Sequence, residues 1–71
     1  MTKQELKNKI GLRIVALRER KGWSQSDLAR AYHKDRQAIE KIERGIVNPT
    51  VFTLSELSDA MEMTLNEFLD M

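Results

Sequence analysis

The sequence lacks cysteine and has one proline, three glycines and four aromatic residues among its 71 positions. Without cysteine there is no disulfide, thiol nucleophile or cysteine-based zinc site. A domain of this length buries only about 60% of the surface of its unfolded chain, so its stability must come from close helix packing or self-association. There is no apolar run of the roughly 20 residues that a membrane helix needs, and Met1–Gly11 is too polar for a secretory signal. We expect one cytoplasmic domain over residues 3–71, without a membrane partner.

Basic residues are absent from the C-terminal third of the chain. Residues 1–48 contain all 12 lysines and arginines with six acidic residues, whereas residues 49–71 contain five acidic residues and no base. The net charge of +1 hides this division. Such a distribution is typical of a surface that approaches a polyanion with one end and turns the other away, although a chance fluctuation in solvated charge is the alternative.

Stretches with strand-like alternation are also absent, and apolar residues recur instead at helical spacing. A first helix is predicted from Thr2 or Lys3 to just before Gly22. Its apolar stripe consists of Leu6, Ile10, Ile14 and Leu17. A second helix is predicted after Ser24, which forms a capping box with Asp27. Trp23 can pack on Leu28 as a hydrophobic staple, and the inward side of this helix consists of Leu28, Ala29 and Tyr32.

The helical pattern breaks at residues 33–35, and Asp35 is a candidate N-cap for a helix that ends near Arg44, before Gly45. Two short helices joined by a three- or four-residue turn form a helix-turn-helix unit, here residues 24–44. Thr50 can cap a fourth helix, and Thr64 with Glu67 can start a fifth. The apolar residues of these last two helices are Leu54, Leu57, Met61, Phe68 and Leu69.

The helix after Asp35 is the candidate recognition helix, because the major groove of DNA admits one α-helix. With Ile39 and Ile42 turned inward, its exposed side consists of Arg36, Gln37, Glu40, Lys41 and Arg44. Arginine and lysine can bond to guanine and glutamine to adenine. Arg36 and Gln37, at the N-terminal end, are best placed to reach base edges.

An ordered set of residues between about Ile10 and Phe68 resembles the phage-repressor (Cro-like, XRE-like) helix-turn-helix family. The set is Arg18, Gly22-Trp23-Ser24-Gln25, Leu28-Ala29, Ile39, Ile42-Glu43-Arg44-Gly45, Asn48-Pro49-Thr50 and Leu54. The resemblance implies an all-α, five-helix lambda-repressor-like domain that binds double-stranded DNA, commonly as a symmetric dimer.

The same resemblance implies roles for individual residues. The positions that match DNA base contacts are Arg36, Gln37 and Lys41. Those that match contacts to the DNA backbone are Ser24, Gln25 and Arg44. Arg18 and Glu43 fall where the family often has a partly buried ion pair that ties the first helix to the recognition helix.

Three residues depart from the family pattern. His33 stands where glycine usually makes the turn, although histidine tolerates a left-handed conformation better than most residues. Lys34 stands where a buried aliphatic residue is usual. Glu40, a possible modulator of the recognition helix, would be repelled by phosphates unless it accepts from cytosine N4 or pairs with an arginine four residues away. Helix spacing favours the pairing.

Apolar residues crowd the last eleven positions: Met61, Met63, Leu65, Phe68, Leu69 and Met71. They can simply close the core, because methionine fills irregular gaps. They exceed what a short terminal helix can bury in so small a domain, however, and we expect them to form a two-fold dimer interface.

Two functions remain open from the sequence. The first is a sequence-specific transcriptional regulator, a repressor that binds its operator as a homodimer. The second is a protein-interaction module on the same fold, such as an antitoxin-type partner of another protein. The basic exposed helix favours the first. We expect no enzyme, metal or cofactor, because His33 with Asp35 supplies no complete site and there is no phosphate loop or nucleophile motif.

Overall fold

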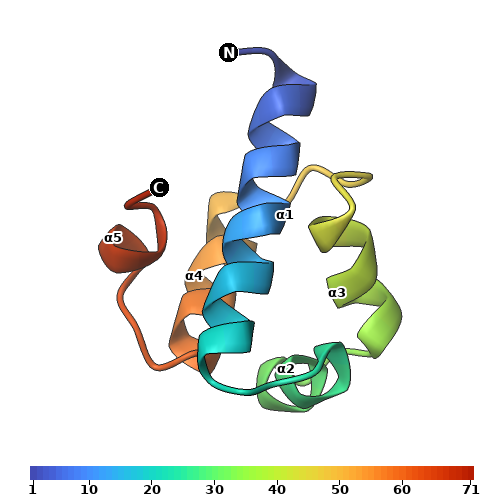
Figure 1. Cartoon of the computed structure of the whole chain (residues 1–71), viewed down its shortest axis with the longest axis vertical. Coiled ribbons are helices and arrows are strands. Elements are labelled where there is room, and N and C mark those ends of the chain that lie inside the picture. The colour runs from blue at the N-terminus through green and yellow to red at the C-terminus, as the bar shows by residue number, and fades with distance from the viewer.

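The computed structural model describes all 71 residues and contains five helices and no strand, which confirms the predicted all-α class. The helices are α1 (Lys3–Arg20), α2 (Gln25–Tyr32), α3 (Arg36–Glu43), α4 (Val51–Ala60) and α5 (Leu65–Phe68). In Figure 1 the long helix α1 runs through the middle, with α3 on one side and α5 on the other, and α2 crosses near the C-terminal end of α1. None of the helices combines the length and apolarity that a membrane span requires.

Every helix begins at an extended residue whose side-chain oxygen accepts a hydrogen bond from a backbone amide three residues on. These N-caps are Thr2, Ser24, Asp35, Thr50 and Thr64. The predicted capping boxes at Ser24 and Thr64 are both present. A third box, at Thr2 with Glu5, was missed, although the Thr-x-x-Glu pattern is visible in the sequence.

Four helices end at a residue in the left-handed conformation: Gly22, His33, Gly45 and Glu62. At His33, φ is 64° and the amide of Lys34 donates to the carbonyl of Ala29 at 3.1 Å, which closes a Schellman motif. His33 therefore makes the turn that glycine usually makes in the family. Nothing in the sequence marks Glu62 as a fourth such position.

The core is formed by side chains from all five helices. Its members are Ile10, Ile14, Leu17, Leu28, Ala29, Ile39, Ile42, Leu54, Leu57, Met61 and Phe68. The inward positions predicted for α3 and α4 are confirmed. In the stripe of α1, Leu6 is the exception and is exposed, because the first turns of α1 extend beyond the other helices (Figure 1).

The C-terminal apolar set divides between core and surface. Met61 and Phe68 are buried, so their prediction as dimer-interface residues is wrong: in the folded domain they have no surface to offer. Met63 and Leu65 are half-buried against the core, and Leu69 and Met71 are exposed. Helix α5 is held in place by Arg13 of α1, whose guanidinium donates to the carbonyls of Glu67 (2.7 Å) and Phe68 (2.9 Å). No local sequence pattern predicts this contact, because Arg13 lies 54 residues from Glu67 and 55 from Phe68 along the chain.

Candidate DNA interface

Helix α3 packs on α1 and α2 through the buried side chains of Ile39 and Ile42, and this packing turns its opposite face to solvent. The exposed residues of that face are Arg36, Gln37, Lys41 and Arg44, with Glu40 half-buried between them. Asp35 fixes the start of the helix by accepting from the amide of Ala38 at 3.1 Å. His33 makes the turn before α3, and Asp35 caps the start of this helix. The two residues considered as an acid/base pair therefore both serve to shape the backbone here.

The C-terminal end of α3 lies directly against α1 at Gly11. This glycine is buried, and a Cβ atom placed on it would lie 2.8 Å from the carbonyl oxygen of Ile42. The two backbones therefore approach more closely than any other residue at this position would allow. A glycine inside a strong helical pattern is the one sequence signal for this close approach.

Arg18 and Glu43 form a bidentate ion pair at the same junction. Nε and Nη2 of Arg18 donate to the two carboxylate oxygens of Glu43 at 2.7 and 3.0 Å. The exposed fractions of the two side chains are only 13% and 5%. The hydrogen bond to Glu43 raises the pKa of the Arg18 guanidinium, against the opposing effect of burial. Arg18 also donates to the carbonyl of Trp23 at 3.0 Å, which connects the pair to the start of the helix-turn-helix unit.

Gln25 joins this buried pair to the exposed face. Its Nε2 donates to Glu43 at 2.9 Å, and its Oε1 accepts from Nη1 of Arg36 at 3.1 Å. The residue that the resemblance places on a DNA phosphate is thus bonded within the protein, in a network of three helices. Ser24, its predicted companion, uses its hydroxyl to cap α2. The sequence did not predict the bonds of Gln25, because they depend on how α2 and α3 pack.

Glu40 lies between two arginines on the exposed face. Its Oε1 accepts from Arg44 at 3.1 Å, and its Oε2 lies 3.6 Å from Nη1 of Arg36. The exposed fractions of the Glu40, Arg36 and Arg44 side chains are 34%, 51% and 65%. Of the two arrangements considered for Glu40, the structure contains the intrahelical pairing. We call these three residues the arginine row.

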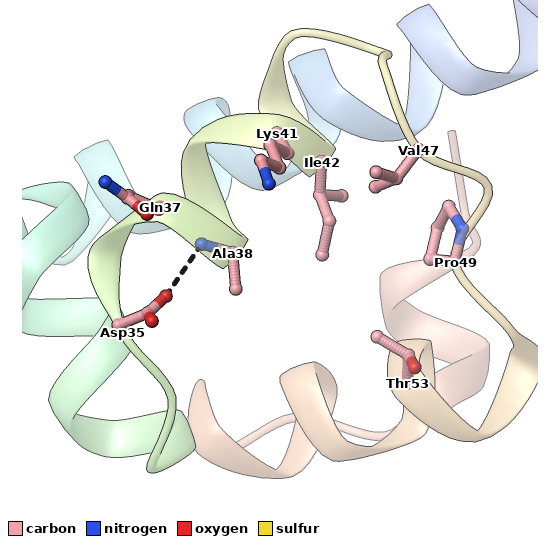
Figure 2. A pocket seen from close by; sticks show the side chains of 8 residues that line it. All are labelled: Asp35, Gln37, Ala38, Lys41, Ile42, Val47, Pro49 and Thr53. Carbon is pink, nitrogen blue, oxygen red and sulfur yellow. Dashed lines mark hydrogen bonds between the residues drawn. The ribbon is translucent and has the colours of Figure 1, made fainter.

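Gln37 and Lys41 form a second row, one helical turn apart, at the edge of an open cleft between α3 and α4. The cleft has a volume of about 360 Å³, and its lining residues are Asp35, Gln37, Ala38, Lys41, Ile42, Val47, Pro49 and Thr53. Figure 2 shows Val47 and Pro49 of the loop after α3 across the cleft from α3, and Thr53 on α4. Lys41 forms no ion pair, so its charge is available to a ligand, whereas the arginine row is partly neutralised.

Comparison with known proteins agrees with this geometry. A family model described as helix-turn-helix (HTH_3) matches residues 14–68. An uncharacterised HTH-type transcriptional regulator, y4dJ of Sinorhizobium fredii, is 33% identical over 57 residues, which span 80% of this chain and 74% of the relative. The resemblance stated from the sequence motifs is thereby confirmed.

Solved structures show the same fold. The restriction-modification controller protein C.AhdI from Aeromonas hydrophila has a TM-score of 0.83 and 32% identity, over 89% of this chain and 91% of its own. The hypothetical transcription factor NHTF from Neisseria has a TM-score of 0.85 and 26% identity, over 97% of this chain and 79% of its own. An HTH_3 family transcriptional regulator from Vibrio cholerae has a TM-score of 0.88 and 27% identity, over 94% of this chain and 38% of its own. The names of these relatives describe transcriptional regulators, a controller protein and a transcription factor. The chain belongs to the HTH_3 helix-turn-helix family of DNA-binding transcriptional regulators.

Proposed function

We propose that this regulator is a repressor that binds its operator as a homodimer, with α3 in the major groove. The observation that carries the proposal is the exposed face of α3, which presents cationic and amide side chains while its inner face is fixed to α1 by the Arg18–Glu43 pair. A rigidly held helix with polar side chains pointing outward is what base recognition requires. The proposed base contacts are Arg36, Gln37 and Lys41.

The proposed contacts to the DNA backbone flank these residues. Ser24 and Gln25 lie at the N-terminus of α2, where first-turn amides have no partner within the helix and the helix dipole favours an anion. Arg44 follows the last residue of α3 and is highly exposed. For Gln25 the contact requires that its side chain exchange a bond within the protein for a phosphate oxygen, or that its backbone amide serve instead.

The proposed dimer interface now includes only the C-terminal residues that retain accessible surface: Met63, Leu65, Leu69 and Met71. A two-fold dimer would place two copies of α3 about one helical turn of DNA apart. Occupation of such an operator by a dimer is a direct means of repression. The mass of the protein in solution, measured by light scattering over a range of concentrations, tests the dimer independently of DNA.

A protein-interaction module is the second candidate, and one surface favours it. Residues 45–55 contain no charged side chain, and within them Ile46, Val51 and Phe52 are exposed, Phe52 to 72%. Uncharged surface with an exposed aromatic side chain is typical of the centre of a protein interface. This function predicts binding of a protein partner without measurable affinity for DNA.

Binding to random duplex DNA at two salt concentrations separates the two functions. A DNA-binding regulator loses affinity steeply as salt rises, because phosphate contacts release counterions. Absent or salt-insensitive binding would contradict the proposal. Selection from random duplexes then supplies the operator for the substitutions below.

Substitutions at Arg36 in α3 and at Arg44, which directly follows this helix, test the assigned roles. We expect Arg36→Ala to relax base preference at one operator position, with a loss of about 1–3 kcal/mol there, and Arg44→Ala to weaken all sequences alike. Lys9→Ala, which removes an exposed positive charge from α1, is the matched control. Equal base preference in the Arg36 and Arg44 variants would show that the roles are wrongly assigned.

A further inference from the structure

The arginine row contains an acid at its centre, on the face of α3 that the proposed function places against DNA. We propose that Glu40 is a specificity-determining residue. In the free domain its carboxylate holds Arg36 and Arg44. On DNA it weakens binding to any duplex in which these two arginines contact phosphates but no base. The inference rests on the proposed DNA-binding function of α3.

The geometry allows one carboxylate to hold both arginines at once. Each oxygen of Glu40 faces a different guanidinium, at 3.1 Å from Arg44 and 3.6 Å from Arg36. Nη1 of Arg36 is also bonded to Gln25, which in turn is bonded to the buried Glu43. Arg36 is therefore positioned from two sides, and its other N–H groups remain available, since a guanidinium has five.

The bonds of Glu40 are easily exchanged, because all three side chains of the row are substantially exposed to solvent. When α3 approaches DNA, both arginines can leave the carboxylate for phosphate oxygens. The carboxylate itself then remains beside the phosphates and repels them, which weakens the electrostatic attraction that drives non-specific binding. Contacts to phosphates alone are thereby weakened.

A duplex with guanine at the right position alters this balance. Arg36 can then bond in a bidentate manner to the base edge while Gln25 and Glu40 keep its guanidinium oriented. This contact to guanine compensates for the repulsion between the Glu40 carboxylate and the phosphates. Most random DNA has no guanine at that position and therefore no such compensation. Removal of the negative charge should therefore strengthen binding to random DNA more than binding to the operator.

The test compares Glu40→Gln with two controls. Glu40→Asp keeps the charge but has a side chain one methylene shorter. Asp70→Asn removes the same charge near α5, which lies on the other side of α1 from α3 (Figure 1). Affinities of all variants are measured on a random duplex and on the selected operator, at 50 and 200 mM salt. Thermal unfolding of each variant, whose midpoint we expect to shift by no more than about 4 °C, shows that the fold is intact.

We expect Glu40→Gln to bind the random duplex about three- to tenfold more tightly at the lower salt, with a salt dependence steeper by up to about one unit of slope. Its preference for the operator over random DNA should fall by a similar factor. Glu40→Asp and Asp70→Asn should each remain within about twofold of the unsubstituted protein on the random duplex.

Two results would overturn the inference while the proposed function stands. One is an unchanged ratio of operator to random affinity in Glu40→Gln. The other is the loss of a preference for cytosine at a single operator position without stronger random binding, which would mean that Glu40 reads cytosine N4 directly. If the unsubstituted protein binds no DNA at either salt concentration, the proposed function itself fails, and the role of Glu40 fails with it.

Discussion

Two glutamates three residues apart on α3 differ in their surroundings. The side chain of Glu43 is only 5% exposed and accepts hydrogen bonds from Arg18 of α1 and Gln25 of α2, whereas that of Glu40 is 34% exposed and pairs only with Arg36 and Arg44. When a buried charge loses its partner, no water can solvate the charge in its place. An exposed charge that loses its partner is solvated by water. The same residue type therefore stabilises the fold at one position and is free to exchange partners at the other.

The largest expected difference between these two glutamates is in stability. Glu43→Gln leaves the largely buried guanidinium of Arg18 without a counter-charge and should cost about 2–4 kcal/mol of unfolding free energy. Glu40→Gln should change it by no more than about 0.5 kcal/mol. Urea unfolding followed by circular dichroism measures both.

A double substitution provides the control for this pair. Replacing Arg18 and Glu43 together by methionine and leucine removes both charges and should restore much of the loss, because apolar side chains of similar volume can replace a buried ion pair. Equal stabilities of the Glu40→Gln and Glu43→Gln proteins would show that burial does not distinguish the two sites.

The close approach of α1 that buries Glu43 depends on Gly11. Glycine to alanine inside an exposed helix normally stabilises a protein by up to about 1 kcal/mol. At Gly11 we expect the opposite sign, a loss of about 1–3 kcal/mol, because the new Cβ would overlap backbone atoms of Ile42 and Glu43, which cannot rotate away. A melting temperature at or above that of the unsubstituted protein would contradict the packing of α1 on α3.

Local signals in the sequence predicted the helices well and their contacts poorly. Ser24, Asp35, Thr50 and Thr64 act as N-caps within three residues of their own position, so the printed sequence contains both partners. The bonds of Gln25 join helices whose relative placement no local pattern specifies. For that reason its bonds within the protein could be found only in the fold.

The C-terminal apolar residues and Glu40 show the same difference between local patterns and tertiary contacts. Met61 and Phe68 were grouped with surface residues because helical spacing does not reveal whether a four-residue helix docks on the core. Glu40 differs, because its candidate partners lie within its own helical segment. Its two alternatives followed from spacing along one helix, and the structure contains the one that spacing favoured.

The capping-box carboxylates of Asp27 and Glu67 differ from that of Glu40 in their partners. They are also accessible to solvent, but they accept hydrogen bonds from backbone amides, which are fixed in place. The amide of Ser24 lowers the pKa of Asp27, and the amide of Thr64 lowers that of Glu67. A lowered folded-state pKa stabilises the protein above the unfolded-state pKa, and this stabilisation is lost as the pH falls through the folded-state value. We therefore expect stability to decrease below about pH 4.

Replacement of one of these carboxylates measures how much it contributes to the loss of stability at low pH. Asp27→Asn should make the unfolding free energy less dependent on pH below about 4, because its titrating group is gone. Carboxyl chemical shifts followed by NMR through the same range measure the lowered pKa values of Asp27 and Glu67 directly. A pH dependence equal to that of the unsubstituted protein would mean that the Asp27 bond contributes nothing.

The smallest expected effect concerns the turn that leads into α3. His33 has φ of 64°, which costs a side chain about 1 kcal/mol relative to glycine, so His33→Gly should stabilise the domain by about 0.5–1 kcal/mol. Gly22→Ala is the matched control: φ there is 73° with no atom near the added Cβ, so the backbone cost alone should destabilise by a similar amount. Because His33 is exposed and outside the network of Gln25 and Glu43, operator preference should not change. A changed preference would show that the turn, as well as the two glutamates of α3, controls how the helix meets DNA.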